Sequence, residues 1–398
     1  MKKALATILA LVMAIGLCSV SWATGSTLPT AENGVIKLTE NVTLTERWEV
    51  AANTEITLDL NGYSITSAGQ VIMNNGKLTI TDNKGGGKIV STGSQAIGVG
   101  SNSVTNIQKA IVESVEGAVI TGRAIGAIIN IYDGTFSASD NAVIAGNGSN
   151  REGTGNTINI SGGVFNGKIT TPGYVACGIY APWKDNINVT GGTFNITGGA
   201  GIVARAGNVT VTNAVFNTTG NATGKVGDSR VVVPCSAIVF DSQANYPAMN
   251  NDSVIHVVSG KFNSEMNAVS MIKNDNETDR VAVTGGTFST DVKEYLAEGK
   301  ILQKNGDTYT AVTNSGITSG TYTAKPTVPD GYKVVENTDG TFTVEKVGGY
   351  YYYQPTTDTK TTDTKGSPKT FDVGIALYVG MALTSAAGVA FVGKKRED

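Results

Sequence analysis

Residues 129–136 read Ile-Asn-Ile-Tyr-Asp-Gly-Thr-Phe, and the chain repeats this pattern. Each copy alternates apolar and polar residues, makes a turn that usually contains glycine, and ends on phenylalanine. The copies lie at residues 129–136, 158–165, 187–194, 209–216, 255–262 and 281–288. Their phenylalanines are 29, 29, 22, 46 and 26 residues apart, and we interpret the interval of 46 as close to two repeats with extra loop.

The alternation predicts short strands with one buried face. One such strand cannot cover its own apolar face, but stacked coils can, with parallel strands ~4.8 Å apart. Glycine permits the tight bend between strands, because it adopts positive φ at little cost. A second strand is expected in each coil, at residues 142–145, 178–181, 201–204, 237–240 and 268–271. We therefore predict an all-β fold, a right-handed parallel β-helix (β-solenoid) over residues 34–290.

The pattern stops after Phe288. Residues 291–298 predict one or two helical turns that cap the open end of the solenoid. Turn sequences at 304–307 and 337–340 predict hairpins, the second flanked by strands at 332–335 and 341–344. Residues 291–347 are therefore expected to form a cap and a small β-hairpin module.

The two ends of the chain indicate export. Residues 1–23 join two lysines to an apolar run and end Ser-Trp-Ala, which is typical of a secretory signal peptide. Residues 373–392 carry no charge and have the length of a transmembrane segment, followed by a basic cytoplasmic tail at 393–398. Residues 348–366 are Thr-rich with a near-repeat, and predict a flexible stalk.

Composition excludes several classes of protein. The chain of 398 residues has a net charge of −3, so no nucleic-acid partner is expected. One histidine and three cysteines are too few for a Cys/His zinc cluster. No cofactor and no metal are predicted; the Asn/Asp cluster at 274–279 could take calcium, but it lacks a defined ligand spacing.

The repeats and the C-terminal motif each resemble those of a known class of proteins. The repeats resemble those of pectate-lyase-like right-handed parallel β-helix surface proteins of Gram-positive bacteria. Residues Ser367, Pro368, Lys369, Thr370 and Phe371 precede the apolar segment and resemble a sortase sorting signal, although Ser367 replaces the usual leucine and Phe371 the usual glycine. The resemblance implies cleavage after Thr370 and linkage to peptidoglycan by sortase. Retention by the C-terminal membrane span is the alternative, and both place the solenoid at the cell surface.

The outward positions of the predicted strands carry few groups suited to catalysis. The expected outward columns contain Asn130, Asn159, Asn188, Thr210, His256 and Ala282 on the first strands, and Ile144, Tyr180, Val203, Val239 and Ser270 on the second. Neither column contains Asp or Glu, so paired glycosidase carboxylates are not indicated.

Three charged residues remain as weak catalytic candidates. Arg205 and Asp241 follow equivalent strands in successive coils, and either serve as a lyase base with its partner or form an exposed cross-coil salt bridge. His256 is either a general base or a solvated ladder residue.

Aromatic residues beside the predicted loops suggest ligand binding. Tyr180, Trp183 and Tyr246 lie at or near loops that should emerge along one edge of the stack. Aromatic rings stack on sugars, and Asn and Asp bind hydroxyls, so this edge is a candidate glycan-binding site. Alternatively, Trp183 folds back over its coil and Asn only suits turns. Cys177 and Cys235 either pair or remain two buried thiols.

The function we expect is that of a cell-surface adhesin or glycan-contact module without enzymatic activity, with extracellular glycans or a host surface as partners. A polysaccharide lyase or glycoside hydrolase is the first alternative. A structural surface spacer is the second.

Overall fold

The computed structural model describes residues 27–121, 124–139, 141–146, 155–182, 184–227, 232–242, 254–273 and 280–348. The chain divides into a compact unit that ends at Val347 and a second unit from Gly348. The predicted signal peptide, the sorting motif and the apolar segment at 373–392 lie outside the described residues. Within the described residues, no helix is both long enough and apolar enough to cross a membrane.

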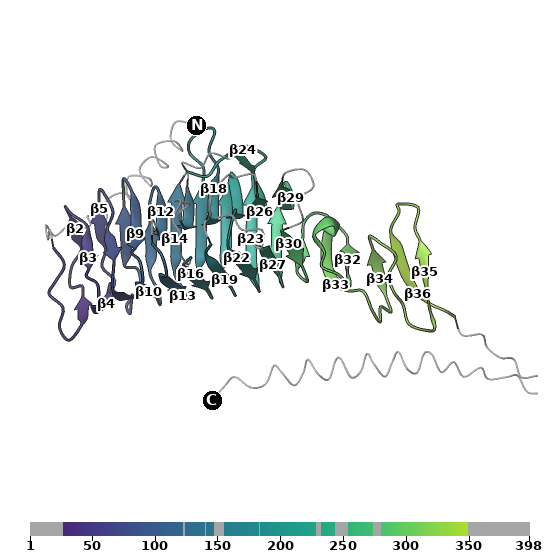
Figure 1. Cartoon of the computed structure of the whole chain (residues 1–398), viewed down its shortest axis with the longest axis horizontal. Helices are drawn as coiled ribbons and strands as arrows, with labels where there is room; N and C mark the ends of the chain where they lie inside the picture. Colours follow the sequence, from purple (N-terminus) through teal and green to yellow (C-terminus); the bar gives the residue numbers. More distant parts are fainter. Residues whose placement is uncertain are drawn as a thin grey trace, which may run out of the picture. The chain divides into compact units, whose positions relative to one another are not determined.

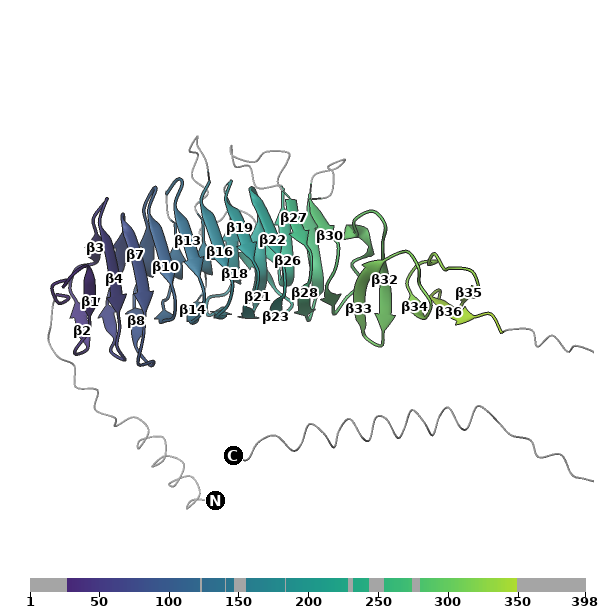
Figure 2. The same cartoon turned by 90° about the horizontal axis from the view of Figure 1, so that it is seen from below.

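The body is a parallel β-solenoid of the right-handed type, in which each coil adds one strand to each of three sheets (Figures 1 and 2). Sheet 1 contains β1 (Val35–Lys37), β4 (Glu55–Asp59), β7 (Lys77–Thr81), β10 (Val104–Ile107), β13 (Ile128–Ile131), β16 (Thr157–Ile160), β19 (Asn186–Val189), β22 (Asn208–Val211), β27 (Val254–Val257) and β30 (Val281–Val283). Sheet 2 contains β2 (Val42–Leu44), β5 (Ile65–Ser67), β8 (Lys88–Ser91), β11 (Ile111–Glu113), β14 (Thr135–Ser139), β17 (Val164–Lys168), β20 (Thr193–Thr197), β23 (Ala214–Thr219), β28 (Gly260–Ser264) and β31 (Thr287–Phe288). Sheet 3 contains β3 (Trp48–Val50), β6 (Ile72–Asn74), β9 (Gln95–Val99), β12 (Gly117–Ile120), β15 (Ala142–Ala145), β18 (Ala176–Ala181), β21 (Gly199–Ala204), β26 (Ser236–Asp241) and β29 (Asn267–Ile272). The nine strands of sheet 3 correspond to about nine turns, which confirms the predicted parallel β-solenoid.

A ladder of phenylalanine rings runs through the core along sheet 2. The six phenylalanines of the sequence repeat stack in order, with ring centroids 4.4–5.5 Å apart and planes within 9–11° of each other. All six are fully buried. Isoleucine and valine form similar columns, as in the register Ile129–Ile158–Ile187–Val209 of sheet 1. The repeated residues are therefore the ones that fill the interior.

The interval of 46 residues is one coil, so the interpretation as two coils was wrong. β23 pairs directly with β28, which places Phe216 opposite Phe262. An antiparallel hairpin of β24 (Thr223–Lys225) and β25 (Val232–Pro234) accounts for part of the extra length. Residue spacing cannot distinguish an added coil from an insertion, because both lengthen the interval.

The outer face of sheet 3 differs from the prediction. Ala145, rather than Ile144, occupies the register of Tyr180, and Ile144 faces the core opposite Ile179. Val203 and Val239, predicted to face outward, are fully buried in a second apolar cluster. This cluster includes Val226 and Val233 from the hairpin and its flank. The insertion between β23 and β26 therefore covers part of the outer face of sheet 3, which strand alternation alone predicts to be exposed to solvent.

The C-terminal module continues sheet 2. One 3₁₀ turn at Lys293–Tyr295 follows the solenoid, and β33 (Thr308–Thr313) then pairs antiparallel with β31. The sheet goes on through β32 (Lys300–Asn305), β34 (Gly320–Tyr322), β36 (Phe342–Lys346) and β35 (Tyr332–Glu336). Both predicted hairpins, β32–β33 and β35–β36, are present.

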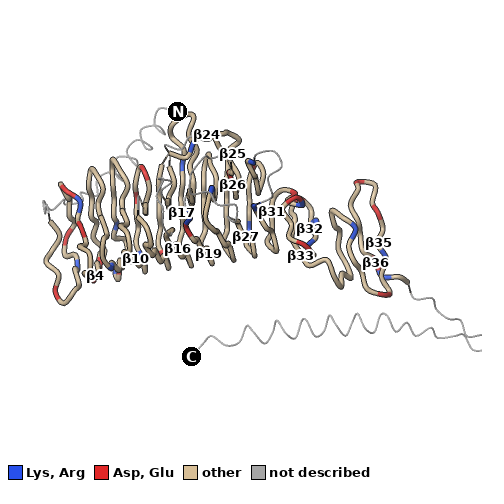
Figure 3. Tube along the Cα trace, viewed as in Figure 1, with Lys and Arg blue, Asp and Glu red and all other residues tan. Residues whose placement is uncertain are grey.

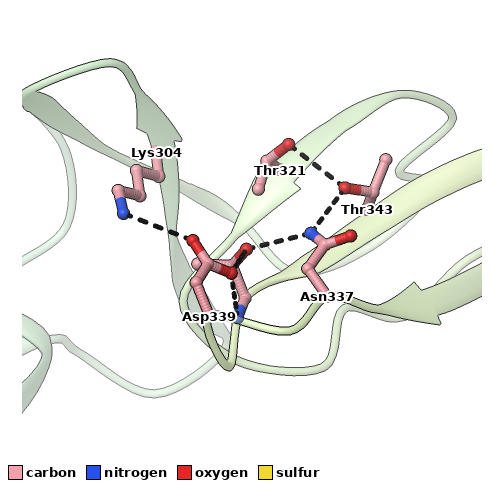
Figure 4. A network of polar contacts seen from close by, with 6 residues as sticks. Lys304, Thr321, Asn337, Asp339 and Thr343 are labelled. Atoms are coloured by element: carbon pink, nitrogen blue, oxygen red, sulfur yellow. Dashed lines mark hydrogen bonds and ion pairs between the residues drawn. The ribbon is translucent and has the colours of Figure 1, made fainter.

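A polar network fixes the turn between β35 and β36 (Figure 4). Asp339 accepts hydrogen bonds from the Thr341 backbone N and Oγ1 at 3.0 and 2.6 Å, and these hold the pKa of Asp339 below its usual value. Asn337 Nδ2 donates to Oγ1 of Thr341 and of Thr343, at 2.9 and 2.8 Å. Lys304 Nζ lies 3.8 Å from Asp339 Oδ2 and so links this turn to β32.

The substitution Phe194→Ala tests the aromatic ladder. Phe194 lies between Phe165 and Phe216, at 4.4 and 4.6 Å, so its loss leaves a cavity with rings on both sides. We expect the free energy of unfolding to fall by about 3–5 kcal/mol, measured by guanidinium titration. Val164→Ala, at an exposed position of the same sheet, is the control and should change it by about 0.5 kcal/mol or less. Equal effects of the two substitutions would contradict a central role for the ladder.

Candidate functional site

The connections from sheet 3 to sheet 1 leave along one edge, here called the loop edge. Hydrogen bonds join the corners of successive coils, including Asn186 N to Asn156 O at 2.8 Å and Asn208 N to Asp185 O at 2.9 Å. The described ends of the predicted loops therefore lie in one row, as the sequence predicts. Trp183, Tyr246 and residues 274–279 lie outside the described residues.

Arg205, Asp241 and Tyr180 meet where three strands of sheet 3 reach the loop edge. Arg205 Nε lies 3.0 Å from Asp241 Oδ2, in an ion pair with both side chains fully buried. Arg205 Nη1 donates to the Tyr180 hydroxyl at 2.7 Å, and its guanidinium carbon lies 5.3 Å from the centre of the tyrosine ring. Ala204 and Phe240 are paired in register, so the two charged residues follow directly from the coil stacking.

This geometry favours a structural role for the ion pair. The predicted cross-coil salt bridge is present, but the prediction that it is exposed was wrong, because neither side chain has any solvent exposure. A carboxylate and a guanidinium without solvent exposure cannot reach a polymer outside the protein. Tyr180 is also committed to Arg205, which contacts both its hydroxyl and its ring.

Carboxylates are scarce on the solenoid strands (Figure 3). The described strands β1–β31 hold five, namely Glu49, Asp59, Glu55, Glu113 and Asp241. Each has a cationic or amide partner, as in Glu55 with Lys77 at 2.6 Å and Glu113 with Lys88 at 2.9 Å. Within strands β1–β31, the register therefore brings no two carboxylates of neighbouring coils together.

Sheet 1 instead presents a ladder of side-chain amides. Asn130 Nδ2 donates to Asn106 Oδ1 at 2.8 Å, Asn159 to Asn130 at 2.8 Å, and Asn188 to Asn159 at 2.9 Å. Asn130 and Asn159 are half-buried and Asn188 is exposed. Thr210, the exposed His256 and Ala282 continue the column as predicted, without a carboxylate in register beside His256. We call Asn106, Asn130, Asn159 and Asn188 the sheet 1 amide ladder.

A second amide ladder lies on sheet 2 and was not predicted. Asn195, Asn217 and Asn263 each donate to the preceding asparagine, beginning with Asn166, at 2.9–3.2 Å. The signal was visible in the sequence, since each of these asparagines directly follows a repeated phenylalanine. The two ladders lie on different sheets and so provide matched positions for comparison.

Asp185 is a buried acid at the loop edge that sequence reasoning missed. Its Oδ1 accepts hydrogen bonds from Asn156 N and Nδ2 at 2.8 and 3.0 Å, while its Oδ2 is buried without a hydrogen-bond partner. Burial raises the pKa of Asp185 to about 6, although the bonds from Asn156 act in the opposite direction. The sequence signal is positional, because Asp185 and Asn156 each stand two residues before a repeated isoleucine.

Neither metal nor disulfide chemistry is indicated in the part of the chain that the structure describes. No group of three or more His, Cys, Asp or Glu side chains there could hold a metal ion. Cys177 and Cys235 are two buried free thiols, and burial raises the pKa of Cys177 to about 12. Of the two alternatives for these cysteines, the structure shows the unpaired one.

Breaking the buried ion pair should be costly. Asp241→Asn keeps the shape of the side chain but removes the charge opposite Arg205, so we expect a loss of about 3–5 kcal/mol in the free energy of unfolding. Glu55→Gln, in the exposed cross-coil pair with Lys77, should cost at most about 1 kcal/mol. Guanidinium unfolding of both variants makes the comparison. A cost for Asp241→Asn as small as that of Glu55→Gln would show that the buried charges do not depend on each other.

Asp185 should make the protein less stable as the pH rises from about 4 to about 6. In this window the folded state binds more protons than the unfolded state, whose carboxyl has a pKa near ~3.9. The shift to about 6 corresponds to at most about 3 kcal/mol, lost fully above pH 6. Asp185→Asn should remove this slope and stabilise the protein at pH 7, as measured by unfolding at a series of pH values.

Asp59→Asn is the control of opposite sign. Burial raises the pKa of Asp59, but hydrogen bonds from Asn83 and Asn61 and the charge of Lys37 outweigh it and lower the pKa. Asp59 therefore stabilises the fold above the unfolded pKa and loses this effect as the pH falls. A pH slope that survives in Asp185→Asn would contradict the assignment.

Known proteins give no further constraint on this site. No protein-family model, no curated protein and no solved structure matches the chain. The function therefore has to be inferred from the residues and their arrangement.

Proposed function

We propose that the solenoid is a glycan-contact module without catalytic activity, an adhesin displayed at the cell surface. The observation that carries the proposal is the sheet 1 amide ladder. It presents four amides in a row on a half-exposed face that adjoins the loop edge.

The chemistry of the ladder suits sugar hydroxyls. An asparagine amide has two N–H donors and an oxygen that accepts two hydrogen bonds, and the ladder uses one donor and one acceptor site of each inner amide. A hydroxyl both donates and accepts, so it can bind the groups that remain. Strands β10, β13, β16, β19 and β22 carry no charged residue, which favours a neutral glycan over a polyanion.

Display at the surface rests on the sequence predictions for the two ends. The signal peptide would direct export, residues 348–366 would act as a stalk, and the motif at 367–371 would allow sortase to link the chain to peptidoglycan. The segment at 373–392 would hold the chain in the membrane before cleavage. A protein placed in this way meets extracellular glycans or a host surface first.

A structural surface spacer is the second candidate. It is favoured by the fact that the ladder amides bind each other and the phenylalanines stack without a break, since such a body is stiff without any ligand. The enzymatic alternative, a polysaccharide lyase or hydrolase, would need acidic groups accessible to a polymer.

The experiment is a binding assay of the full-length protein on plant, mucin and bacterial polysaccharides, with release of new sugar ends measured in the same wells. We expect retention without release. The triple substitution of Asn130, Asn159 and Asn188 to threonine should weaken binding by roughly five-fold for each amide that contacts the ligand, because each lost amide contact contributes about 1 kcal/mol.

The matched control is the triple substitution of Asn166, Asn195 and Asn217 to threonine on sheet 2. It removes equivalent ladder bonds from another face and should leave binding unchanged. Equal loss in both variants would show that the ladders act only through stability. Release of sugar ends would overturn the proposal in favour of the enzyme, and absence of retention on every surface would favour the spacer.

A further inference from the structure

Two adjoining hollows lie at the N-terminal half of the loop edge. One, of about 410 Å³, opens on the outer face of sheet 3, and we call it the sheet 3 hollow. The other, of about 440 Å³, lies beside it over the corners that lead into sheet 1. Both are lined in part by Asn75 and Ser101, so they lie side by side. Each volume falls in the range of about 300–1,000 Å³ that is typical of small-ligand sites.

Gly98 lines the sheet 3 hollow. It stands in register between Met73 of the preceding coil and Ile120 of the next, so one coil of this column has no side chain. Its backbone is not in the left-handed region, and the local conformation therefore does not require glycine. A Cβ at this position would clash with the Gln70 amide and press on the Met73 sulfur. The glycine thus gives Gln70 room to reach over bare backbone.

The same column is filled further along the solenoid. Val203 and Val239 occupy it there and are buried under the second apolar cluster. The hollow is therefore confined to the first coils, where the hairpin of β24 and β25 does not contribute to the lining.

Groups of two kinds line the sheet 3 hollow. Met73 and Ile120 offer apolar surface, whereas Gln70, Gln95 and Asn75 offer amides. Thr121 also lines it, and its fully buried Oγ1 has no hydrogen-bond partner. A buried hydroxyl without a partner is short of the bond it would make with water, so a ligand bond that forms when the wall opens to this atom is favoured.

The charges around the hollows are paired. Arg47 donates from Nη1 to Gln70 Oε1 at 3.2 Å and lies 3.9 Å from Glu49, which in turn accepts a bond from Asn75 at 2.6 Å. In the adjoining hollow, Lys77 and Glu55 form an ion pair at 2.6 Å. Neither hollow therefore has an uncompensated charge to attract an ion.

We propose that the sheet 3 hollow binds a neutral pyranose unit of a glycan chain, and that the adjoining hollow holds the neighbouring unit. The apolar face of the sugar ring packs on Met73 and Ile120, and its hydroxyls bond to the amides of Gln70, Gln95 and Asn75. This inference rests on the proposed function, since it gives glycan contact a defined site and a ligand class.

Gly98→Ile is the test. Isoleucine is the residue that the next coil has in this register, and at position 98 it would displace the Gln70 amide and occupy the hollow. The full-length protein and its variants are titrated calorimetrically with neutral hexasaccharides of β-1,4-linked glucose, mannose, xylose and N-acetylglucosamine, and with the parent polymers. We expect the affinity for the glycan that the native protein binds to fall at least ten-fold.

Two further variants keep the test decisive. Thr193→Ile places the same side chain on sheet 2, between Val164 and Val215, and should leave affinity unchanged. Thr121→Val keeps the shape of the wall but removes its hydroxyl, so it should weaken binding several-fold without lowering the unfolding temperature. If Gly98→Ile fails to fold, Thr121→Val decides.

The outcomes separate the two proposals. Native affinity in a folded Gly98→Ile protein, or in Thr121→Val where the first variant does not fold, overturns the hollow as the site and leaves the proposed function standing. If the native protein binds none of the sugars or polymers, the proposed function fails and the site falls with it.

Discussion

Parallel stacking in register is the constraint on which the rest of the structure depends. Each side chain of a coil must lie against its equivalent in the next coil, at a strand spacing of ~4.8 Å. Residues that pair well with copies of themselves satisfy this condition: phenylalanine rings stack, isoleucines pack and asparagine amides bond head to tail. A charged residue repeated in the same column would lie against a residue of the same charge. This repulsion explains why the strands carry so few charged residues.

The exceptions to self-pairing lie where strands end. Arg205 and Asp241 occupy equivalent positions in successive coils but carry opposite charges. Stacking therefore brings them together as a buried ion pair, where two like charges would repel. Asn156 and Asp185 follow the same logic, because an amide donates where a second carboxylate would repel. The loop edge thus holds three buried ionisable groups, Arg205, Asp241 and Asp185, where the strands of sheet 3 end and the corner to sheet 1 begins.

Much of the fold was predictable because the same sequence pattern recurs in each coil. The alternation around Ile129, Ile158 and Ile187 gave the strands of sheet 1, and the turn sequences at 304–307 and 337–340 gave both hairpins. What could not be predicted depends on contacts made by non-repeated segments. The insertion between Phe216 and Phe262 contributes Val226 and Val233 to the apolar cluster that buries Val203 and Val239, which alternation alone places in water.

The candidate site was predictable only in outline. The sequence placed the loops on one edge and the amides of Asn130, Asn159 and Asn188 on one face. The lining of the hollow depends on Gly98, where the absence of a side chain lets the Gln70 amide lie over the backbone. One glycine among 50 carries no signal of its own until the register of β9 with its neighbours is known. Similarly, the raised pKa of Asp185 follows from its burial, which the residue type argues against.

The self-pairing ladders also bear on how such a chain can change length during evolution. Coils built around Phe136 and Phe165 have similar partners above and below, so duplication or deletion of one 29-residue unit there keeps phenylalanine stacked on phenylalanine. The coils that hold Arg205 and Asp241 lack this freedom, because each needs the other as its immediate neighbour. Variation in the number of coils is therefore expected to occur among the coils without a buried charge, and not between the coils that carry Arg205 and Asp241.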